Sequence, residues 1–153
     1  KQRGFEVKPS IRPMQKEDIG AVVSLDRLIL GQSLGEAAFE EELKDNPLNR
    51  YFVMEDEAGV IVGHIGLWLD PPLAQILNFY VIPGLRKQGL GTTLFTFALE
   101  TCRRLNVDTV TLEVRPTNHA AIRFYRRFGF FKAAIRKQYY ADGQDADLML
   151  LSL

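Results

Sequence analysis

The sequence predicts a single domain of the α/β or α+β class, in which helices stand before and after a mixed sheet. Its 153 residues are close to the roughly 150 of a typical domain. Hydrophobic residues make up 46% and charged residues 25%, which are ordinary globular values and exclude a disordered chain. Segments with helical spacing alternate along the chain with segments of strand-forming residues. We therefore expect one domain over residues 1–153.

The first half of the chain predicts two helices followed by three strands. Apolar residues recur at helical spacing in the first segment, and Glu17 and Asp18 suit its first turn. The second, acidic helix should end before Asn46-Pro47. The last strand is apolar on both faces, as a buried central strand would be. The helices are expected at 16–30 and 36–44, and the strands at 51–55, 60–69 and 74–82.

The second half predicts a helix, a strand, another helix and a hairpin. Cys102 lies on the apolar stripe of the first helix, so we interpret it as a core residue rather than a nucleophile. Asn118 is a candidate N-cap for the second helix, and Gly129 ends that helix. The turn Asp142-Gly143 joins the hairpin. The expected ranges are 90–105 and 119–127 for the helices and 109–115, 130–140 and 145–151 for the strands.

Charge and cysteine content narrow the classes of function. Lys plus Arg equals Asp plus Glu, 19 each, which disfavours a generic binder of nucleic acid. A single cysteine excludes an internal disulfide and fits a reducing compartment. No apolar run approaches the ~18–20 residues of a membrane span, and the first residues do not resemble a secretion signal. We expect a cytoplasmic protein with no membrane partner; the oligomeric state stays open.

The zero net charge hides an asymmetry along the chain. Between residues 36 and 57, eight acidic residues face only Lys44 and Arg50. Between residues 86 and 137, eleven basic residues face only Glu100, Asp108 and Glu113. The pattern fits solvated helix faces, or an anionic ligand on the C-terminal half and a cationic one on the N-terminal half. The acids are Glu36, Glu40, Glu41, Glu42, Asp45, Glu55, Asp56 and Glu57, and the bases are Arg86, Lys87, Arg103, Arg104, Arg115, Arg123, Arg126, Arg127, Lys132, Arg136 and Lys137.

The most informative segment runs from a buried strand into a basic, glycine-containing turn that opens a helix. It reads Arg86-Lys87-Gln88-Gly89-Leu90-Gly91-Thr92. The unpaired N–H groups and positive dipole end of a helix N-terminus favour phosphate, and glycines let a ligand approach the backbone. A dinucleotide fingerprint would need a third glycine where Leu94 stands, and a P-loop would need Gly-Lys-Ser/Thr. A purely structural turn is the alternative interpretation.

A second segment places polar residues on a strand and on the helix that follows it. Glu113 alternates to the face opposite Leu112 and Val114, and Asn118 and Tyr125 lie two helical turns apart on one face. A carboxylate and a phenol placed in this way can flank one reacting centre. Spacing alone favours the structural alternative, with Glu113 on a solvated face and Tyr125 in the core.

Taken together, the two segments resemble the acetyl-CoA-dependent N-acetyltransferase superfamily known as GNAT, and within it the bacterial ribosomal-protein-alanine N-acetyltransferases. The resemblance covers residues 11–151. It implies a mixed, twisted sheet of about seven strands, splayed near residues 78–81, with about four helices. The residues that carry it are Arg86-x-x-Gly89-x-Gly91, Thr111-Leu112-Glu113-Val114-Arg115, Asn118, Ala120-Ala121-Ile122, Tyr125, Gly129-Phe130, Ile135-Arg136, Tyr139-Tyr140, Asp142-Gly143 and Asp145-Ala146.

The resemblance also implies a cofactor site and catalytic roles. Glu113 would be the proton acceptor and Tyr125 the proton donor, with acetyl-CoA as cosubstrate and no metal. Because an ordinary glutamate, with a pKa of about 4.3, is a weak base, Glu113 should act through a water molecule or with a raised pKa. The residues implied to hold acetyl-CoA are Phe79, Tyr80 and Val81 for the pantetheine arm, Lys87, Gln88, Gly89, Leu90, Gly91 and Thr92 for the pyrophosphate, Arg86 beside them, and Asn118.

The same subfamily implies the acceptor, the N-terminal alanine of a basic, small-subunit ribosomal protein. An α-amine, with a pKa of about 7.7–8.0, needs less help from a base than a lysine at about 10.4. The chain departs from the family at three places: Ser33-Leu34-Gly35 replaces the frequent Pro-Trp-Ser, Tyr80 replaces a small residue, and His119 stands where alanine or a polar residue is common. Because the first departure lies in a loop that helps shape the acceptor site, a small amine, a protein lysine or a catalytically silent acyl-CoA-binding domain stay open.

Overall fold

A computed structural model describes residues 8–153, with the exception of the side chains of Arg86 and Lys87. This part of the chain holds four α-helices, two short 3-10 helices and seven strands, which confirms the predicted helix and strand content. The helices are η1 (Lys16–Asp18), α1 (Ile19–Ile29), α2 (Glu36–Asp45), η2 (Pro83–Gln88), α3 (Leu90–Arg104) and α4 (His119–Arg127). The strands are β1 (Ser10–Pro13), β2 (Asn49–Glu55), β3 (Ile61–Asp70), β4 (Leu73–Val81), β5 (Thr109–Val114), β6 (Phe131–Arg136) and β7 (Ala146–Ser152).

The strands form a mixed sheet in the order β1-β2-β3-β4-β5-β7-β6. The ladder between β4 and β5 is parallel and pairs only Leu73–Gln75 with Thr109–Thr111. By contrast, β5 pairs antiparallel with β7 along all six of its residues. Parallel and antiparallel ladders therefore occur in one sheet, which confirms the predicted mixed sheet.

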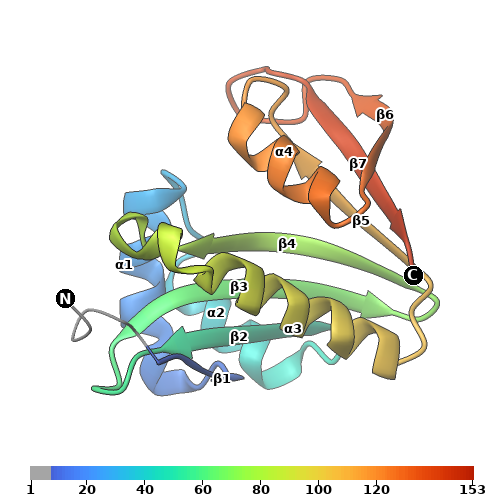
Figure 1. Cartoon of the computed structure of the whole chain (residues 1–153). Coiled ribbons are helices and arrows are strands. Elements are labelled where there is room, and N and C mark those ends of the chain that lie inside the picture. The colour runs from blue at the N-terminus through green and yellow to red at the C-terminus, as the bar shows by residue number, and fades with distance from the viewer. Residues whose placement is uncertain (1–7) are drawn as a thin grey trace, which may run out of the picture. The chain divides into compact units, whose positions relative to one another are not determined.

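The chain divides into two compact units, which we describe separately. Unit 1 contains the residues up to Trp68 together with Leu77–Thr101, and unit 2 contains Leu69–Ile76 and Cys102–Leu153. In unit 1, α1 and α2 cover one face of the sheet and α3 covers the other (Figure 1). Phe39 of α2 packs edge-on to Tyr51 with 5.4 Å between ring centroids, and Phe79 of β4 meets Phe95 of α3 at 5.1 Å.

Two buried titratable side chains are uncharged at neutral pH. Cys102 is fully buried, and burial raises the pKa of its thiol to about 11, which confirms it as a core residue. His64 of β3 is also fully buried, and burial lowers the pKa of its imidazole to about 4. The ring of His64 stacks on Tyr51 at 5.9 Å. Neither the thiol nor the imidazole is therefore expected to act as nucleophile or base in the acetyl transfer that the family resemblance implies.

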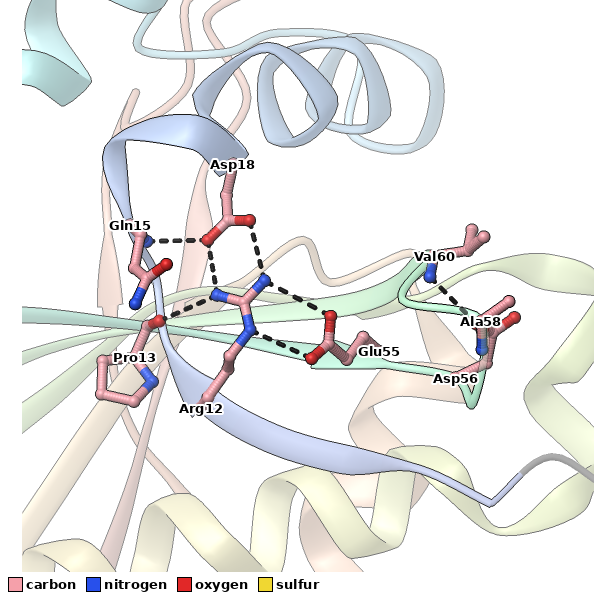
Figure 2. A network of polar contacts seen from close by, with 8 residues as sticks. All are labelled: Arg12, Pro13, Gln15, Asp18, Glu55, Asp56, Ala58 and Val60. Atoms are coloured by element: carbon pink, nitrogen blue, oxygen red, sulfur yellow. Dashed lines mark hydrogen bonds and ion pairs between the residues drawn. The ribbon is translucent and has the colours of Figure 1, made fainter.

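An ion-pair network holds the start of the first helix against the sheet (Figure 2). Arg12 of β1 donates to both carboxylate oxygens of Asp18, at 2.7 and 2.9 Å, and its Nε donates to Glu55 of β2 at 3.1 Å. The backbone N–H of Gln15 donates to the same Asp18 carboxylate at 2.7 Å. Asp18 is buried, and these bonds, above all those from Arg12, hold the pKa of its carboxyl below the usual range.

We expect Arg12→Met to lower the free energy of unfolding by about 3 kcal/mol, because it leaves the buried Asp18 carboxylate without its bidentate partner. Urea unfolding at pH 7 measures the loss, and Arg27→Met, at an exposed position of α1, is the control. Since the pKa of Asp18 is lowered in the folded state, its stabilisation is present above pH of about 3.9 and lost below it. The difference in free energy of unfolding between Arg12→Met and the parent chain should therefore become smaller in acid. A difference that does not change with pH would contradict this account.

Unit 2 contains α4 and the strands β5, β7 and β6. The predicted hairpin forms, but β6 ends at Arg136 instead of continuing to residue 140. The pairing of β6 with β7 contains a register shift between Lys132 and Ala134. The connection over 137–145 folds on itself. Asp145 accepts the backbone N–H of Gln138 at 2.9 Å, which replaces the ladder bond that a longer strand would make.

Candidate functional site

The turn predicted to hold phosphate lies in unit 1 and leads directly into α3. Gly89 stands between η2 and α3 with a left-handed φ of 76°, and its carbonyl accepts the backbone N–H of Thr93 at 3.0 Å. The first N–H groups of the helix therefore have no acceptor within the helix. A Cβ built on Gly89 would meet no heavy atom within 4 Å, so space is open beside the backbone.

The strand that precedes this turn buries its side chains in the core of unit 1. Tyr80 and Val81 are 4% and 3% exposed. The ring of Phe79 contacts Phe95. Because the side chains of Tyr80 and Val81 are buried, these two residues can offer a ligand their backbone groups, which is the kind of contact that the resemblance implies. The predicted side-chain contribution of Arg86 and Lys87 falls outside the described side chains.

Glu113 of β5, in unit 2, is not on a solvated face, since its side chain is only 6% exposed. The side chains of Leu112 and Val114 lie on the opposite, core face, as predicted. The carboxylate of Glu113 is surrounded by one cation, Arg136, and two neutral donors, Gln75 and Tyr139. Arg136 of β6 lies 2.8 Å from Oε2, while Gln75 of β4 donates to Oε1 at 2.6 Å.

The sequence analysis missed the donors that surround this carboxylate. Gln75 received no role, although it is one of only two polar residues, with Asn78, in a strand that is otherwise apolar. Arg136 was noted only in the basic segment and in the family resemblance, and Tyr139 only in the resemblance. The hydroxyl of Tyr139 lies 3.5 Å from Oε1 of Glu113, the longest of these contacts. It is therefore the contact that a water molecule would displace most readily.

Tyr125 lies in α4, and Asn118 is the residue that caps the start of this helix. Burial raises the pKa of the Tyr125 phenol to about 12, and the nearby Tyr140 adds to the shift. The ring centroid of Tyr125 lies 6.0 Å from that of Phe130. The predicted N-cap is confirmed, because Asn118 Oδ1 accepts the N–H of Ala121 at 3.2 Å. The cap uses one lone pair of Oδ1, so Nδ2 and the second lone pair of Oδ1 are the side-chain groups that Asn118 could offer to a cofactor.

The predicted charge asymmetry is reduced by pairing inside unit 2. Among the described side chains, at least four of the eleven basic residues form ion pairs, three with acidic residues beyond residue 137 and one with Glu113. On α2, Glu36, Glu40, Glu41 and Asp45 remain exposed, whereas Glu42 accepts the hydroxyl of Tyr51 at 2.8 Å. The acidic surface of α2 is thus the clearest remaining charge feature. The four pairs are Arg115–Asp142, Lys132–Asp147, Arg136–Glu113 and Lys137–Asp145.

Neither a metal site nor a membrane span emerges from the described residues. Within residues 8–153, no group of three or more His, Cys, Asp or Glu side chains is arranged to hold a metal ion. In the same part of the chain, no helix combines the length and the apolar character needed to cross a membrane.

Comparison with known proteins supports the family resemblance that the two sequence segments suggested. A match to the acetyltransferase (GNAT) family covers residues 21–130. A Bacillus subtilis protein, provisionally named a ribosomal protein bS18-alanine N-acetyltransferase, is 36% identical over 97% of this chain and 99% of its own length. An N-alpha-acetyltransferase of Sulfolobus acidocaldarius is 31% identical, covering 97% of this chain and 95% of its own.

A solved structure gives the same result for the fold. The ribosomal-protein-S18-alanine N-acetyltransferase of Escherichia coli superposes with a TM-score of 0.83 at 27% identity, covering 95% of this chain and 94% of that one. The family match covers most of the chain, and the first relative is similar along its whole length. The chain therefore belongs to the GNAT family and is an N-acetyltransferase.

Proposed function

We propose that this enzyme transfers the acetyl group of acetyl-CoA to the α-amine of a protein N-terminus, the alanine of a small-subunit ribosomal protein. The observation that carries the proposal is the nearly buried Glu113 carboxylate on β5, in a chain so similar to a protein named for acetylating the alanine of bS18. Acetyl-CoA supplies an activated thioester carbon, and the residues of the chain manage the protons and charge around it.

Glu113 accepts the proton that the amine loses, through a water molecule in place of the long Tyr139 contact. Arg136 and Gln75 fix the carboxylate in the meantime, so that it does not turn away from the acceptor. Backbone N–H groups at the end of β4 donate to the thioester carbonyl oxygen, where negative charge develops. The amine nitrogen thus gains the acetyl carbon as the carbon–sulfur bond breaks.

Tyr125 donates a hydrogen bond to the departing sulfur. A free thiol has a pKa of about 8.5, so complete transfer from a phenol at about 12 is uphill. The burial that keeps Tyr125 protonated therefore favours a hydrogen bond that strengthens as the thiolate forms. The final proton on the sulfur can then arrive as the product leaves.

The turn at Gly89 gives a test of acetyl-CoA binding. We expect Gly89→Val to weaken binding at least about tenfold, because valine is strained at a φ of 76° and its side chain would enter the open space. Isothermal titration calorimetry measures the affinity. Gly84→Val is the matched control, since Gly84 lies in the same turn, also has open space, and does not have a positive φ.

A second substitution separates strain from occupancy of the open space beside this turn. Gly89→Asn should keep the turn, because asparagine tolerates the left-handed region, and should still place a side chain in the space. If both Gly89 variants bind acetyl-CoA as tightly as the parent chain does, the pyrophosphate is not held at this turn.

The choice of an α-amine acceptor follows from chemistry and charge. The pKa of an α-amine is about 2.5 units lower than that of a lysine, so removing its proton costs ~3.4 kcal/mol less free energy. The exposed acids of α2 attract a basic protein and speed its encounter. The relatives point to the same acceptor class, since they are named for α-amines or for the alanine of bS18.

The acceptor assay offers three amines with acetyl-CoA and reads by mass spectrometry which nitrogen gains the acetyl group. They are an alanine-initiated basic peptide, the same peptide with a blocked N-terminus and an internal lysine, and spermidine. We expect the first to react fastest and its KM to rise with salt, because exposed charges are screened within about 8–10 Å. Faster acetylation of either other amine would overturn the acceptor assignment. Binding of acetyl-CoA without any transfer would support a silent domain.

A further inference from the structure

Asp26, near the end of α1, is a buried carboxylate that the proposed chemistry does not use. It is 1% exposed, and burial raises the pKa of its carboxyl. A charge in such a place needs donors around it. Two hydroxyls supply them: Tyr80 of β4 donates to Oδ1 at 2.6 Å, and Ser33 of the α1–α2 loop donates to Oδ2 at 2.8 Å. One carboxylate therefore joins a loop to a strand.

The loop side of this contact is closely held. The Ser33 hydroxyl also accepts the backbone N–H of Gly35 at 3.2 Å, and the carbonyl of Asp26 accepts the N–H of Leu30 at 2.7 Å. Gly31 and Gly35 have φ values of 81° and 90°, which fix the bends on either side of Ser33. Asp26 thus holds the loop over 30–35 with both its backbone and its side chain.

The strand side leads to the proposed site of the thioester. Tyr80 stands between Phe79 and Val81, and its hydroxyl also lies 3.4 Å from the carbonyl of Val22 in α1. Figure 1 shows the C-terminal ends of α1 and β4 at the same end of unit 1. Both partners of Asp26 lie at places where the sequence departs from the family pattern described above. A tyrosine at position 80 is what allows β4 to reach the carboxylate.

The loop itself presents apolar side chains to solvent. Leu30 and Leu34 are 42% and 53% exposed, and the acidic helix α2 begins immediately afterwards at Glu36. A basic peptide drawn to α2 would therefore meet this loop close to the end of β4.

We propose that Asp26 is a positioning residue that fixes the loop over 30–35 against β4. The distance between this loop and the end of β4, where the thioester is proposed to lie, then stays constant for the acceptor that binds there. The inference rests on the proposed function, because it assumes that a peptide binds beside β4. It predicts that loosening either hydroxyl contact weakens acceptor binding, and that loosening the Ser33 contact does so without affecting acetyl-CoA.

Two minimal substitutions test this role. Ser33→Ala and Tyr80→Phe each remove one oxygen and keep the rest of the side chain. We expect each to raise KM for the alanine-initiated basic peptide about tenfold, the effect of one hydrogen bond to a charged group. In Ser33→Ala, which lies outside the proposed acetyl-CoA site, kcat and the Kd of acetyl-CoA should be nearly unchanged. Because both contacts act through one carboxylate, the double variant should lose less than the product of the single losses. Ser24→Ala, at an exposed position of α1, is the control.

Amide hydrogen exchange gives a readout that does not depend on activity. Exchange over residues 31–35 should be faster in Ser33→Ala, Tyr80→Phe and Asp26→Asn than in Ser24→Ala. An unchanged peptide KM in folded Ser33→Ala and Tyr80→Phe variants would overturn the inference, as would unchanged exchange. If the parent chain acetylates no peptide N-terminus, the proposed function fails, and exchange alone then decides whether Asp26 holds the loop.

Discussion

Replacing Glu113 with glutamine is expected to lower kcat about 10²- to 10⁴-fold while leaving the affinity for acetyl-CoA close to that of the parent chain. The amide keeps the shape of the carboxylate and an oxygen for the bond from Gln75, but it cannot take a proton. Arg136 would then contact a neutral amide at position 113, where the native glutamate side chain is only 6% exposed. The loss should therefore fall on turnover.

Glu100→Gln is the matched control, because it makes the same chemical change at an exposed position of α3. Circular dichroism and urea unfolding establish that both variants are folded. The dependence of kcat on pH should also change in Glu113→Gln, since a base has been removed. Parent-like turnover, or an identical pH profile, would return Glu113 to a structural role.

The parts of the site that the sequence could predict are those fixed by local structure. The helix start after Gly89 follows from a glycine in a left-handed turn, and the Asn118 cap follows from a side chain that reaches three residues ahead. The alternation that separates Glu113 from Leu112 follows from strand geometry. Each of these depends on neighbours within a few residues.

The environment of Glu113 could not be predicted in the same way, because its partners are distant in the sequence. Gln75 is 38 residues away and reaches the carboxylate through the short parallel ladder between β4 and β5. Arg136 comes from the strand beyond β7. Spacing along the chain therefore favoured a solvated glutamate, whereas the folded unit covers it from two sides.

The strand β1 and the charge balance were missed for a related reason. Ser10–Pro13 is too short to show a pattern of its own, and its place is set by pairing with β2, from Ser10 opposite Glu55 to Pro13 opposite Phe52. The basic excess was overestimated because Asp142, Asp145 and Asp147 lie beyond the counted segment yet pair with bases inside it.

Replacing Tyr125 with phenylalanine is expected to lower kcat by a similar factor, about 10² to 10⁴, with little change in the affinity for acetyl-CoA. The ring and its contact with Phe130 remain, and only the hydroxyl is lost. Because the pKa of this phenol is raised to about 12, the group stays protonated at every pH below about 10. The shape of the pH profile between pH 7 and 9 should therefore be the same in the variant, in contrast to Glu113→Gln.

A change of leaving group separates a role at the sulfur from a general loss of packing. A selenium analogue of acetyl-CoA releases a more acidic selenol, which needs less help from a hydrogen-bond donor as its charge develops. If Tyr125 stabilises the leaving group, the penalty of Tyr125→Phe should shrink with this analogue, because the variant lacks only what the selenol no longer requires. A penalty of the same size for both donors would mean that the hydroxyl acts elsewhere, and parent-like turnover in the folded variant would place Tyr125 in the core alone.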